Sequence, residues 1–218
     1  FNTFKANTIF GTGILNEEGK FRAEFSGRVS TIQSDGYIDR ASTDLKSLFL
    51  SATIFNDKTL FKALAFGGQE VTYQAWYGID RETLENDRTY NPAGEIYDGN
   101  GDLTGYYDNQ VDDYKQDHYQ LHINHDFGNR WTGNLAFHYT YGRGFYEEYR
   151  NDADFGTHGF EPIEVDGEEI NSTDLVRRKW LDNDFYGTTF SLLKDFDNLN
   201  LILGGAFSSY DGDHFGQV

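Results

Sequence analysis

Hydrophobic and polar residues alternate with a period of two along several segments of the chain. In Phe21–Ser30 the odd positions are Phe, Ala, Phe, Gly and Val, while the even positions are Arg, Glu, Ser, Arg and Ser. Tyr119–Phe127 and Trp131–Tyr141 alternate in the same way. This period is that of a β-strand with one apolar and one polar face. Five further strands are predicted, the last two with ambiguous facing: Phe4–Leu15, Leu48–Asn56, Leu199–Tyr210, Leu60–Gln69 and Phe185–Lys194.

The connections between the predicted strands are of two kinds. Four are tight turns, at Asn16–Lys20, Asn56–Thr59, Gly128–Arg130 and Asp197–Asn198. Three are long polar loops, at Thr31–Lys46, Gly78–Gln116 and Arg143–Asp182. Short turns at one rim and long loops at the other are typical of a barrel that spans an outer membrane. The sequence therefore predicts an all-β fold: an antiparallel transmembrane β-barrel with about eight strands here, short periplasmic turns and long extracellular loops.

A half-buried strand of a soluble β-sandwich also alternates, so the period alone leaves two architectures open. Aromatic residues favour the membrane, because Trp131 begins one predicted strand and Tyr139 and Tyr141 end it, as in the aromatic girdles of a barrel. The predicted polar faces also carry charges that suit water better than a dry core, at Arg22, Glu24 and Arg28. A carbohydrate-binding sandwich and a structural or adhesive outer-membrane barrel stay as alternatives.

Composition narrows the class of protein further. The 218 residues have a net charge of −18, which argues against nucleic acid as a partner. The absence of cysteine excludes disulfides, thiolate metal sites and a thiol nucleophile. No apolar run approaches the ~18 residues of a membrane helix. The loops Gly78–Gln116 and Arg143–Asp182 contain 21 of the 36 acidic residues, so the negative charge belongs to one rim.

The order of turns and loops also places the two ends of the chain. The first predicted strand runs from the loop rim to a tight turn, and the last runs from a tight turn back to the loop rim. Both ends then lie on the long-loop side, whereas the ends of a complete outer-membrane barrel lie on the short-turn side. We therefore expect residues 1–218 to be a partial barrel domain, cut from a larger barrel.

A resemblance to a known family rests on eight segments of the chain. They are Phe1–Thr3, Ser34–Arg40, Asp44–Ser47, Tyr73–Trp76, Arg88–Glu95, Tyr146–Arg150, Arg177–Leu192 and Tyr210–Gly216. These segments resemble the barrel domain of TonB-dependent outer-membrane receptors, especially the ferric-citrate and siderophore branch. The resemblance implies a 22-stranded barrel in the outer membrane of a Gram-negative bacterium, with a plug domain that is absent from this chain. It also implies import of a ferric siderophore or citrate-type chelate, with energy from the TonB–ExbB–ExbD complex acting through an absent N-terminal TonB box. No cofactor is implied.

Aromatic and arginine residues in and beside the long loops are the candidates for binding cargo. Rings stack on a planar ligand, and guanidinium groups form bidentate hydrogen bonds with an anionic chelate. The candidates are Trp76, Tyr90, Tyr107, Arg143, Tyr146, Arg150, Arg177, Arg178 and Trp180. The alternative is that these side chains pack the loops against one another and form girdles.

A second group of candidates is expected to face the lumen or the plug. It consists of Arg22, Glu24, Arg28, His118, His122 and His138. The arginines are expected to pair with carboxylates of the plug or to guide an anion. His118 and His122 stand about 13 Å apart on a strand, too far to share one metal ion. His138 is expected opposite Gln120, and the three histidines are interpreted as ordinary residues of the lumen wall.

Asp98, Asn100 and Asp102 have the spacing at which a calcium-binding loop begins. The pattern fails afterwards, because its sixth position is Leu103 and its twelfth is Asn109. Asp-Gly and Asn-Gly pairs are hairpin turns, so Ile96–Tyr107 is interpreted as a small hairpin within the loop. No metal site is predicted, and these three residues are the candidates if calcium binds.

A second small hairpin is predicted at Ile163–Ile170, with its turn at Asp166–Gly167. Acidic pairs such as Glu147–Glu148 are numerous because acids are numerous, and adjacent strand residues point to opposite faces. A glycosidase instead needs two carboxyl groups held ~5–10 Å apart in a rigid cleft. No nucleophile motif, phosphate loop or HExxH sequence occurs, so the chain is not expected to be an enzyme.

Overall fold

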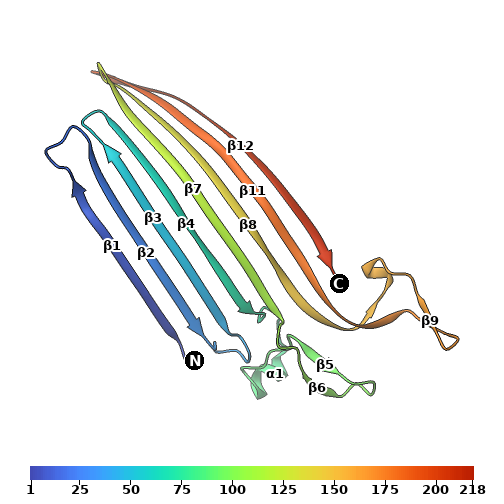
Figure 1. The fold of residues 1–218 in the computed structure, drawn as a ribbon. Coiled ribbons are helices and arrows are strands. Elements are labelled where there is room, and N and C mark those ends of the chain that lie inside the picture. The colour runs from blue at the N-terminus through green and yellow to red at the C-terminus, as the bar shows by residue number, and fades with distance from the viewer.

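The computed structural model describes all residues from 1 to 218, and its eight long strands form one antiparallel sheet (Figure 1). The order is β1-β2-β3-β4-β7-β8-β11-β12, so each long strand pairs with the long strands before and after it in the chain. Their bounds are β1 Phe4–Leu15, β2 Arg22–Ser34, β3 Thr43–Phe55, β4 Thr59–Tyr73, β7 Val111–Gly128, β8 Trp131–Asp154, β11 Ser172–Phe196 and β12 Leu199–Gln217. The predicted all-β, antiparallel arrangement of eight strands is confirmed. The sheet is open, with β1 and β12 at its edges.

The remaining elements lie at the end of the sheet opposite the tight turns (Figure 1). The pair β5 Glu95–Tyr97 and β6 Leu103–Tyr106 forms one hairpin, and β9 Ile163–Val165 with β10 Glu168–Ile170 forms another. Both small hairpins match the sequence prediction. A short helix α1 spans Arg81–Asn86, and a single 3-10 turn η1 spans Gly156–His158. The structure contains no helix with the length and hydropathy to cross a membrane.

The four tight turns are where the sequence predicts them. In the β3–β4 turn, the Asn56 N–H donates to the Thr59 carbonyl at 2.9 Å, and Asn56 Oδ1 accepts from the N–H groups of Lys58 and Thr59. In the β7–β8 turn, Asn129 has φ 50° and Arg130 has φ 60°. Asparagine tolerates this left-handed region because its short side chain bonds locally.

The long loops are shorter than predicted, and this corrects part of the sequence analysis. Most of Arg143–Asp182 is strand, because β8 runs on to Asp154 and β11 begins at Ser172. Tyr141 therefore does not end its strand, and the pairing of β8 with β11 continues past it as far as Ser172↔Asp154. Pairs such as Phe145↔Trp180 and Glu148↔Arg177 stabilise this extension, although its pattern is not one of alternating hydrophobic and polar residues.

The register separates the sheet into an apolar face and a polar face. One row of the apolar face crosses seven strands as Phe25, Ala52, Ala63, Leu121, Phe137, Thr188 and Phe207. The adjacent row on the polar face is Ser26, Ser51, Leu64, Gln120, His138, Gly187 and Ser208. The predicted alternation of the unambiguous strands is thus present in the sheet. It also assigns a facing to β4 and β11, where the sequence left it open.

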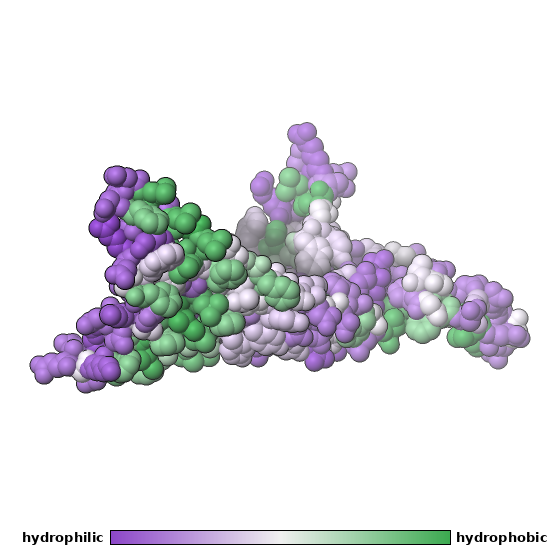
Figure 2. Space-filling model, turned by 90° about the horizontal axis from the view of Figure 1, so that it is seen from above, coloured by the Kyte–Doolittle hydropathy of each residue, from purple (hydrophilic) through white to green (hydrophobic).

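The apolar face is the more exposed of the two. Phe25, Leu121 and Phe137 are 42%, 39% and 45% exposed, whereas the polar-face row from Ser26 to Gly187 is half-buried. Figure 2 shows hydrophobic residues gathered over part of the sheet, with hydrophilic residues at its extremities and on its projections. This is the reverse of a soluble sheet, in which the apolar face is covered.

Little of the chain is fully buried. The buried hydrophobic residues are Tyr73, Ala93, Ala153 and Phe155, and all four lie at the long-loop end. All eight long strands belong to one layer, whereas a sandwich needs two facing sheets with an apolar core between them. The packed part of the molecule therefore lies at the loop end of the sheet.

Candidate functional site on the polar face

Two rows of polar-face residues cross the sheet near its loop end. The first row consists of Asp112, Tyr146, Lys179 and Gly216, on β7, β8, β11 and β12. The second consists of Glu70, Tyr114, Gly144, Leu181 and His214, and begins on β4. Directly opposed residues have Cβ atoms about 4.5–5.5 Å apart. The sheet register thus brings acidic, aromatic and basic side chains from five strands into one area.

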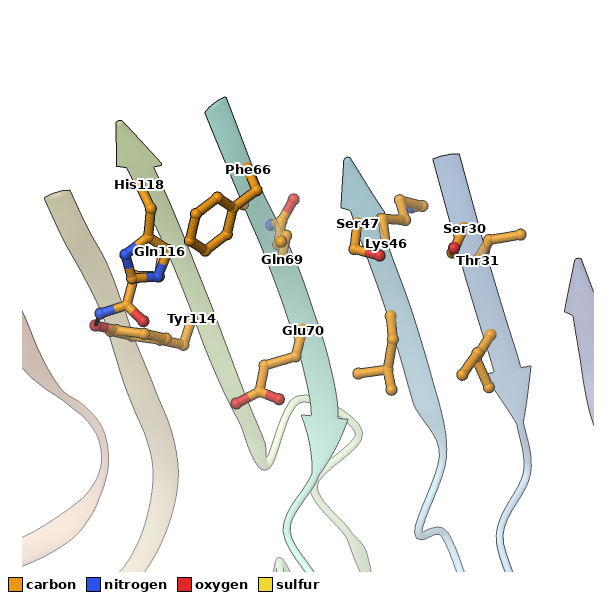
Figure 3. Close-up of a pocket in the computed structure, with 14 residues that line it drawn as sticks. Ser30, Thr31, Lys46, Ser47, Phe66, Gln69, Glu70, Tyr114, Gln116 and His118 are labelled. Carbon is orange, nitrogen blue, oxygen red and sulfur yellow. Dashed lines mark hydrogen bonds between the residues drawn. The ribbon is translucent and has the colours of Figure 1, made fainter. Parts of the chain in front are cut away.

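These two rows line a hollow of about 640 Å³. A neighbouring hollow of about 540 Å³ shares Glu70 and Tyr114 with it and extends towards β2. Figure 3 shows this second hollow, with Glu70 and Tyr114 projecting from β4 and β7 beside Gln116 and His118. The loop end of the polar face therefore carries one shallow depression that is long enough for a small ligand.

Two glycines on β8 make room for the ring of Tyr114. A Cβ atom at Gly142 would lie 2.2 Å from the Tyr114 hydroxyl oxygen. A Cβ atom at Gly144 would lie 2.8 Å from Cδ2 of Tyr114 and 2.2 Å from the Asp113 carbonyl oxygen. The ring of Tyr114 consequently lies flat over β8, which keeps the floor of the hollow low.

Tyr146 lines the hollow, and Trp76 packs against the ring of Tyr146. Their ring centroids are 6.2 Å apart in an edge-to-face arrangement, and the Nζ atom of Lys179 lies 5.5 Å from the centroid of Tyr146. Trp76 remains 55% exposed, so its ring can contact a ligand. Of the residues predicted to bind cargo, Tyr146 and Trp180 border the hollow, and Trp76 lies beside Tyr146.

The loop that carries Trp76 is held firmly to the sheet. Gln74 is 1% exposed, and its Nε2 donates to the carbonyl oxygens of Glu147 at 2.8 Å and Val111 at 3.2 Å. Asn91, 2% exposed, donates to the carbonyl oxygens of Asp39 and Gln74, at 2.9 Å in both cases. These hydrogen bonds fix both Gln74 and Asn91, and so they hold the start of the loop Gln74–Gln110 to β7 and β8.

Glu147 is the anchor of the far end of the same loop. Its carboxylate accepts hydrogen bonds from the Tyr107 hydroxyl at 2.6 Å, from Asn109 Nδ2 at 2.5 Å and from Arg178 Nε. Burial opposes ionisation, but these three donors outweigh it and hold the pKa of the Glu147 carboxyl below its usual value. Burial and the bond to Glu147 raise the pKa of the Tyr107 hydroxyl to about 12.

Glu148 binds a second arginine on the opposite face of the sheet. Arg177 Nε and Nη2 lie 2.8 Å and 2.7 Å from Glu148 Oε2, and the Tyr77 hydroxyl donates to Oε1 at 3.2 Å. Together with the pair Arg178–Glu147, this contact neutralises two of the arginines that were predicted to receive an anionic chelate. The sequence analysis placed Arg177 and Arg178 in a loop, but both lie on β11.

The other predicted cargo contacts are also occupied or placed elsewhere. Arg143 lies 3.5 Å from Asp182 and over the ring of Trp180. The ring of Trp180 packs at an angle against Phe145 and stacks on Phe215 on the apolar face, although the residue also borders the hollow. The Tyr90 hydroxyl donates to Glu95 within the loop. Arg150 is exposed at the loop end of β8 and takes part in no ion pair. Arg143, Arg150 and Trp180 therefore lie on strands, although the sequence placed them in a loop.

The sequence analysis did not single out Glu70, Asp112 or Lys179, and it placed Tyr114 among the aromatic residues of a loop, whereas Tyr114 lies on β7. The period-two pattern of the polar face does continue before the predicted strand, at Asp112, Tyr114, Gln116 and His118. This signal could have extended β7 towards its N-terminus. The facing of Lys179 depends on the pairing of β8 with β11. It has no local signature.

The predicted lumen residues all lie on the polar face. His118 shares a hydrogen bond of 2.8 Å with Thr140 and stacks on Phe66, and His122 bonds to Gln120 at 3.0 Å. His138 pairs with Gln120 across the strands, as the sequence predicts. Near the tight turns, Arg22 binds Asp57 at 2.6 Å, while Glu24 and Arg28 are exposed.

The calcium candidates form a turn of the β5–β6 hairpin. Asp98 Oδ1 accepts from the backbone N–H groups of Asn100 at 2.8 Å and Asp102 at 3.0 Å. These bonds lower the pKa of the Asp98 carboxyl and account for its position without a cation. No group of three or more His, Asp or Glu side chains in the structure is arranged to hold a metal ion.

Neither a protein-family model nor a curated protein sequence matches this chain. A functional assignment therefore rests on the geometry of the sheet and of its hollows.

Proposed function

We propose that this chain is part of a transmembrane β-barrel in the outer membrane of a Gram-negative bacterium, and that the barrel is a receptor that imports a small polar cargo. One observation carries the membrane assignment: an open, single-layer sheet has a hydrophobic face that is more exposed than its polar face. Such a sheet is stable in a lipid bilayer. The apolar residues of each strand then face the hydrocarbon, and the polar residues between them face the inside of the barrel.

The height of the apolar band agrees with this proposal. On β8 the band runs from Trp131 to Tyr139, nine residues, and a transmembrane strand needs about 9–11. Beyond Tyr139, the same face carries charges, since Tyr141 pairs with Asp184 and Arg143 with Asp182. Aromatic side chains at both limits and charges outside them are the arrangement of a membrane-spanning wall.

The free edges of the sheet support the assignment to a barrel. The strands β1 and β12 each present one row of unpaired backbone groups, which a stable membrane sheet cannot leave in lipid. Pairing of these edges, with each other or with further strands, would close the barrel, and the polar face would line its lumen. The resemblance to TonB-dependent receptors adds a plug and energy coupling to this proposal.

Two neighbouring positions on β7 provide the test of the membrane assignment. In a protein whose native tryptophans are replaced by phenylalanine, Leu121→Trp and His122→Trp place one indole on the apolar face and one on the polar face. In vesicles of brominated lipid we expect strong quenching at position 121 and little at position 122. Equal quenching at the two positions would contradict a lipid-facing apolar surface.

The transport role is tested separately in cells. A ferric chelate is the cargo that the resemblance implies, so a deletion strain should grow poorly on at least one ferric siderophore or ferric citrate when iron is limiting. Unimpaired growth on every ferric chelate would remove the support for iron import. It would leave the membrane assignment intact.

A further inference from the structure

The 640 Å³ hollow contains two carboxylates without a cationic partner. Neither Glu70 nor Asp112 belongs to any of the eight ion pairs of the chain. They are diagonal neighbours on β4 and β7, since Glu70 pairs with Tyr114 and Thr72 with Asp112. Burial, together with Glu70 and Asp113, raises the pKa of the Asp112 carboxyl, which indicates that no cation of the protein stabilises its charge.

Lys179 provides an ammonium group in the lining of the same hollow. Lys179 also belongs to no ion pair, and its Nζ lies over the ring of Tyr146. Asp112, Tyr146 and Lys179 occupy one row, on three adjacent strands. Because neighbouring strands are 4.7–4.9 Å apart, the backbones that carry the two charges are separated by about 10 Å.

We propose that this hollow binds a dipolar ligand whose ammonium group pairs with Glu70 and Asp112 and whose carboxylate pairs with Lys179. The rings of Tyr114 and Tyr146 lie between the two charged ends and provide an apolar contact for the middle of the ligand. An extended peptide spans about 3.3–3.6 Å per residue, so the backbone separation sets an upper limit of about three residues on the length of the ligand. The inference rests on the proposed function, in which the polar face is a water-filled lumen.

The charges of the hollow favour a ligand that carries both signs of charge. An anionic chelate would leave Glu70 and Asp112 uncompensated, and the nearby Arg177 is already bound to Glu148. A ligand with only a positive charge would leave Lys179 without a partner. Trp76 is 55% exposed beside Tyr146 and offers an open aromatic ring next to the hollow.

The experiment is a calorimetric titration of the intact protein, purified in detergent, with trialanine. Two capped forms of the same peptide, N-acetyl-trialanine and trialanine amide, each lack one of the two charges. We expect each capped form to bind about tenfold more weakly than trialanine, the loss of one charged hydrogen bond. Equal binding of all three forms would overturn the inference, as would no binding of trialanine by a protein that inserts correctly into vesicles.

Substitutions assign each end of the ligand to its partner. Glu70→Gln and Asp112→Asn should remove the preference for the free amine and keep the preference for the free carboxylate. Lys179→Met should remove the preference for the free carboxylate and keep the preference for the free amine.

Glu17→Gln, in the exposed turn at the opposite end of the sheet, is the matched control and should bind all three peptides as the unaltered protein does. A uniform loss of affinity for all three peptides in every hollow variant would contradict the assignment. Failure of the brominated-lipid test alone would contradict the membrane proposal and not the ligand.

Discussion

Arg177 binds Glu148 through two nitrogen atoms, with Nε at 2.8 Å and Nη2 at 2.7 Å from the same carboxylate oxygen. The next pair along the two strands, Arg178 with Glu147, repeats the contact on the other face of the sheet. Two adjacent arginines and two adjacent glutamates thus compensate one another where β8 and β11 approach the loops. The arginines hold the loop end together, and their charges are no longer free for an anionic ligand.

The pair Arg178–Glu147 should contribute measurably to stability. Arg178→Met leaves the Glu147 carboxylate, whose side chain is 3% exposed, without its cation. Removing one partner of a buried pair typically costs 3–5 kcal/mol, and partial exposure of Arg178 reduces this to about 2–3 kcal/mol. Chemical unfolding followed by tryptophan fluorescence measures the change. Arg150→Met is the matched control, because Arg150 is exposed and has no ion pair, and it should change the free energy of unfolding by less than about 0.5 kcal/mol.

Tyr107 should control how firmly the loop Gln74–Gln110 is held. Tyr107→Phe removes the hydroxyl that donates to Glu147 at 2.6 Å and keeps the ring that stacks on Tyr149. The expected cost is about 1–2 kcal/mol, expressed as faster amide hydrogen exchange within the loop. Tyr97→Phe removes a hydroxyl from the exposed hairpin of the same loop and should leave exchange near Glu147 unchanged. Similar exchange in the two variants would mean that the hydroxyl of Tyr107 does not anchor the loop.

The same contacts predict how the loop responds to pH. The pKa of Glu147 is lowered in the folded protein, so its contribution is present above the unfolded value of about 4.3 and is lost as the pH falls through the folded value. The pKa of Tyr107 is raised to about 12, so its contribution is present below about pH 10 and is lost as the pH rises through 12. We expect hydrogen exchange of the loop to be pH-independent between these limits, after correction for intrinsic rates. In Glu147→Gln the acid limit should disappear, and an unchanged acid limit would assign it to another carboxyl.

The strands of the central sheet were predictable because the information is local. Alternation in Phe21–Ser30 and Trp131–Tyr141 reports which side chains face which surface, and asparagine and glycine mark the turns between strands. The two small hairpins were predictable for the same reason, since Asp98–Asp102 and Asp166–Gly167 are turn sequences. None of these features needs a partner far away in the chain.

The loop end was less predictable because its stability comes from contacts between distant segments. Arg177 and Glu148 are 29 residues apart, and Gln74 and Glu147 are 73 apart. In the extensions of β8 and β11 both faces carry polar or aromatic residues, so the period-two contrast disappears although the strands continue. For the same reason, the facing of Lys179 could not be predicted from the sequence, and neither could the basic end of the hollow.

The two faces of β7 should respond in opposite ways to a charge. Leu121→Arg places a guanidinium in the apolar row between Ala63 and Phe137, whereas His122→Arg places one on the polar face between Lys62 and Ala136. An arginine that faces lipid near the middle of the bilayer costs about 2–4 kcal/mol, and one that faces a wet lumen is tolerated. Unfolding of the reconstituted protein from lipid vesicles by denaturant should therefore be shifted strongly by the first substitution and weakly by the second. If the two variants lose the same stability, the apolar face does not contact lipid, because neighbouring residues of one strand differ in little except the surface they face.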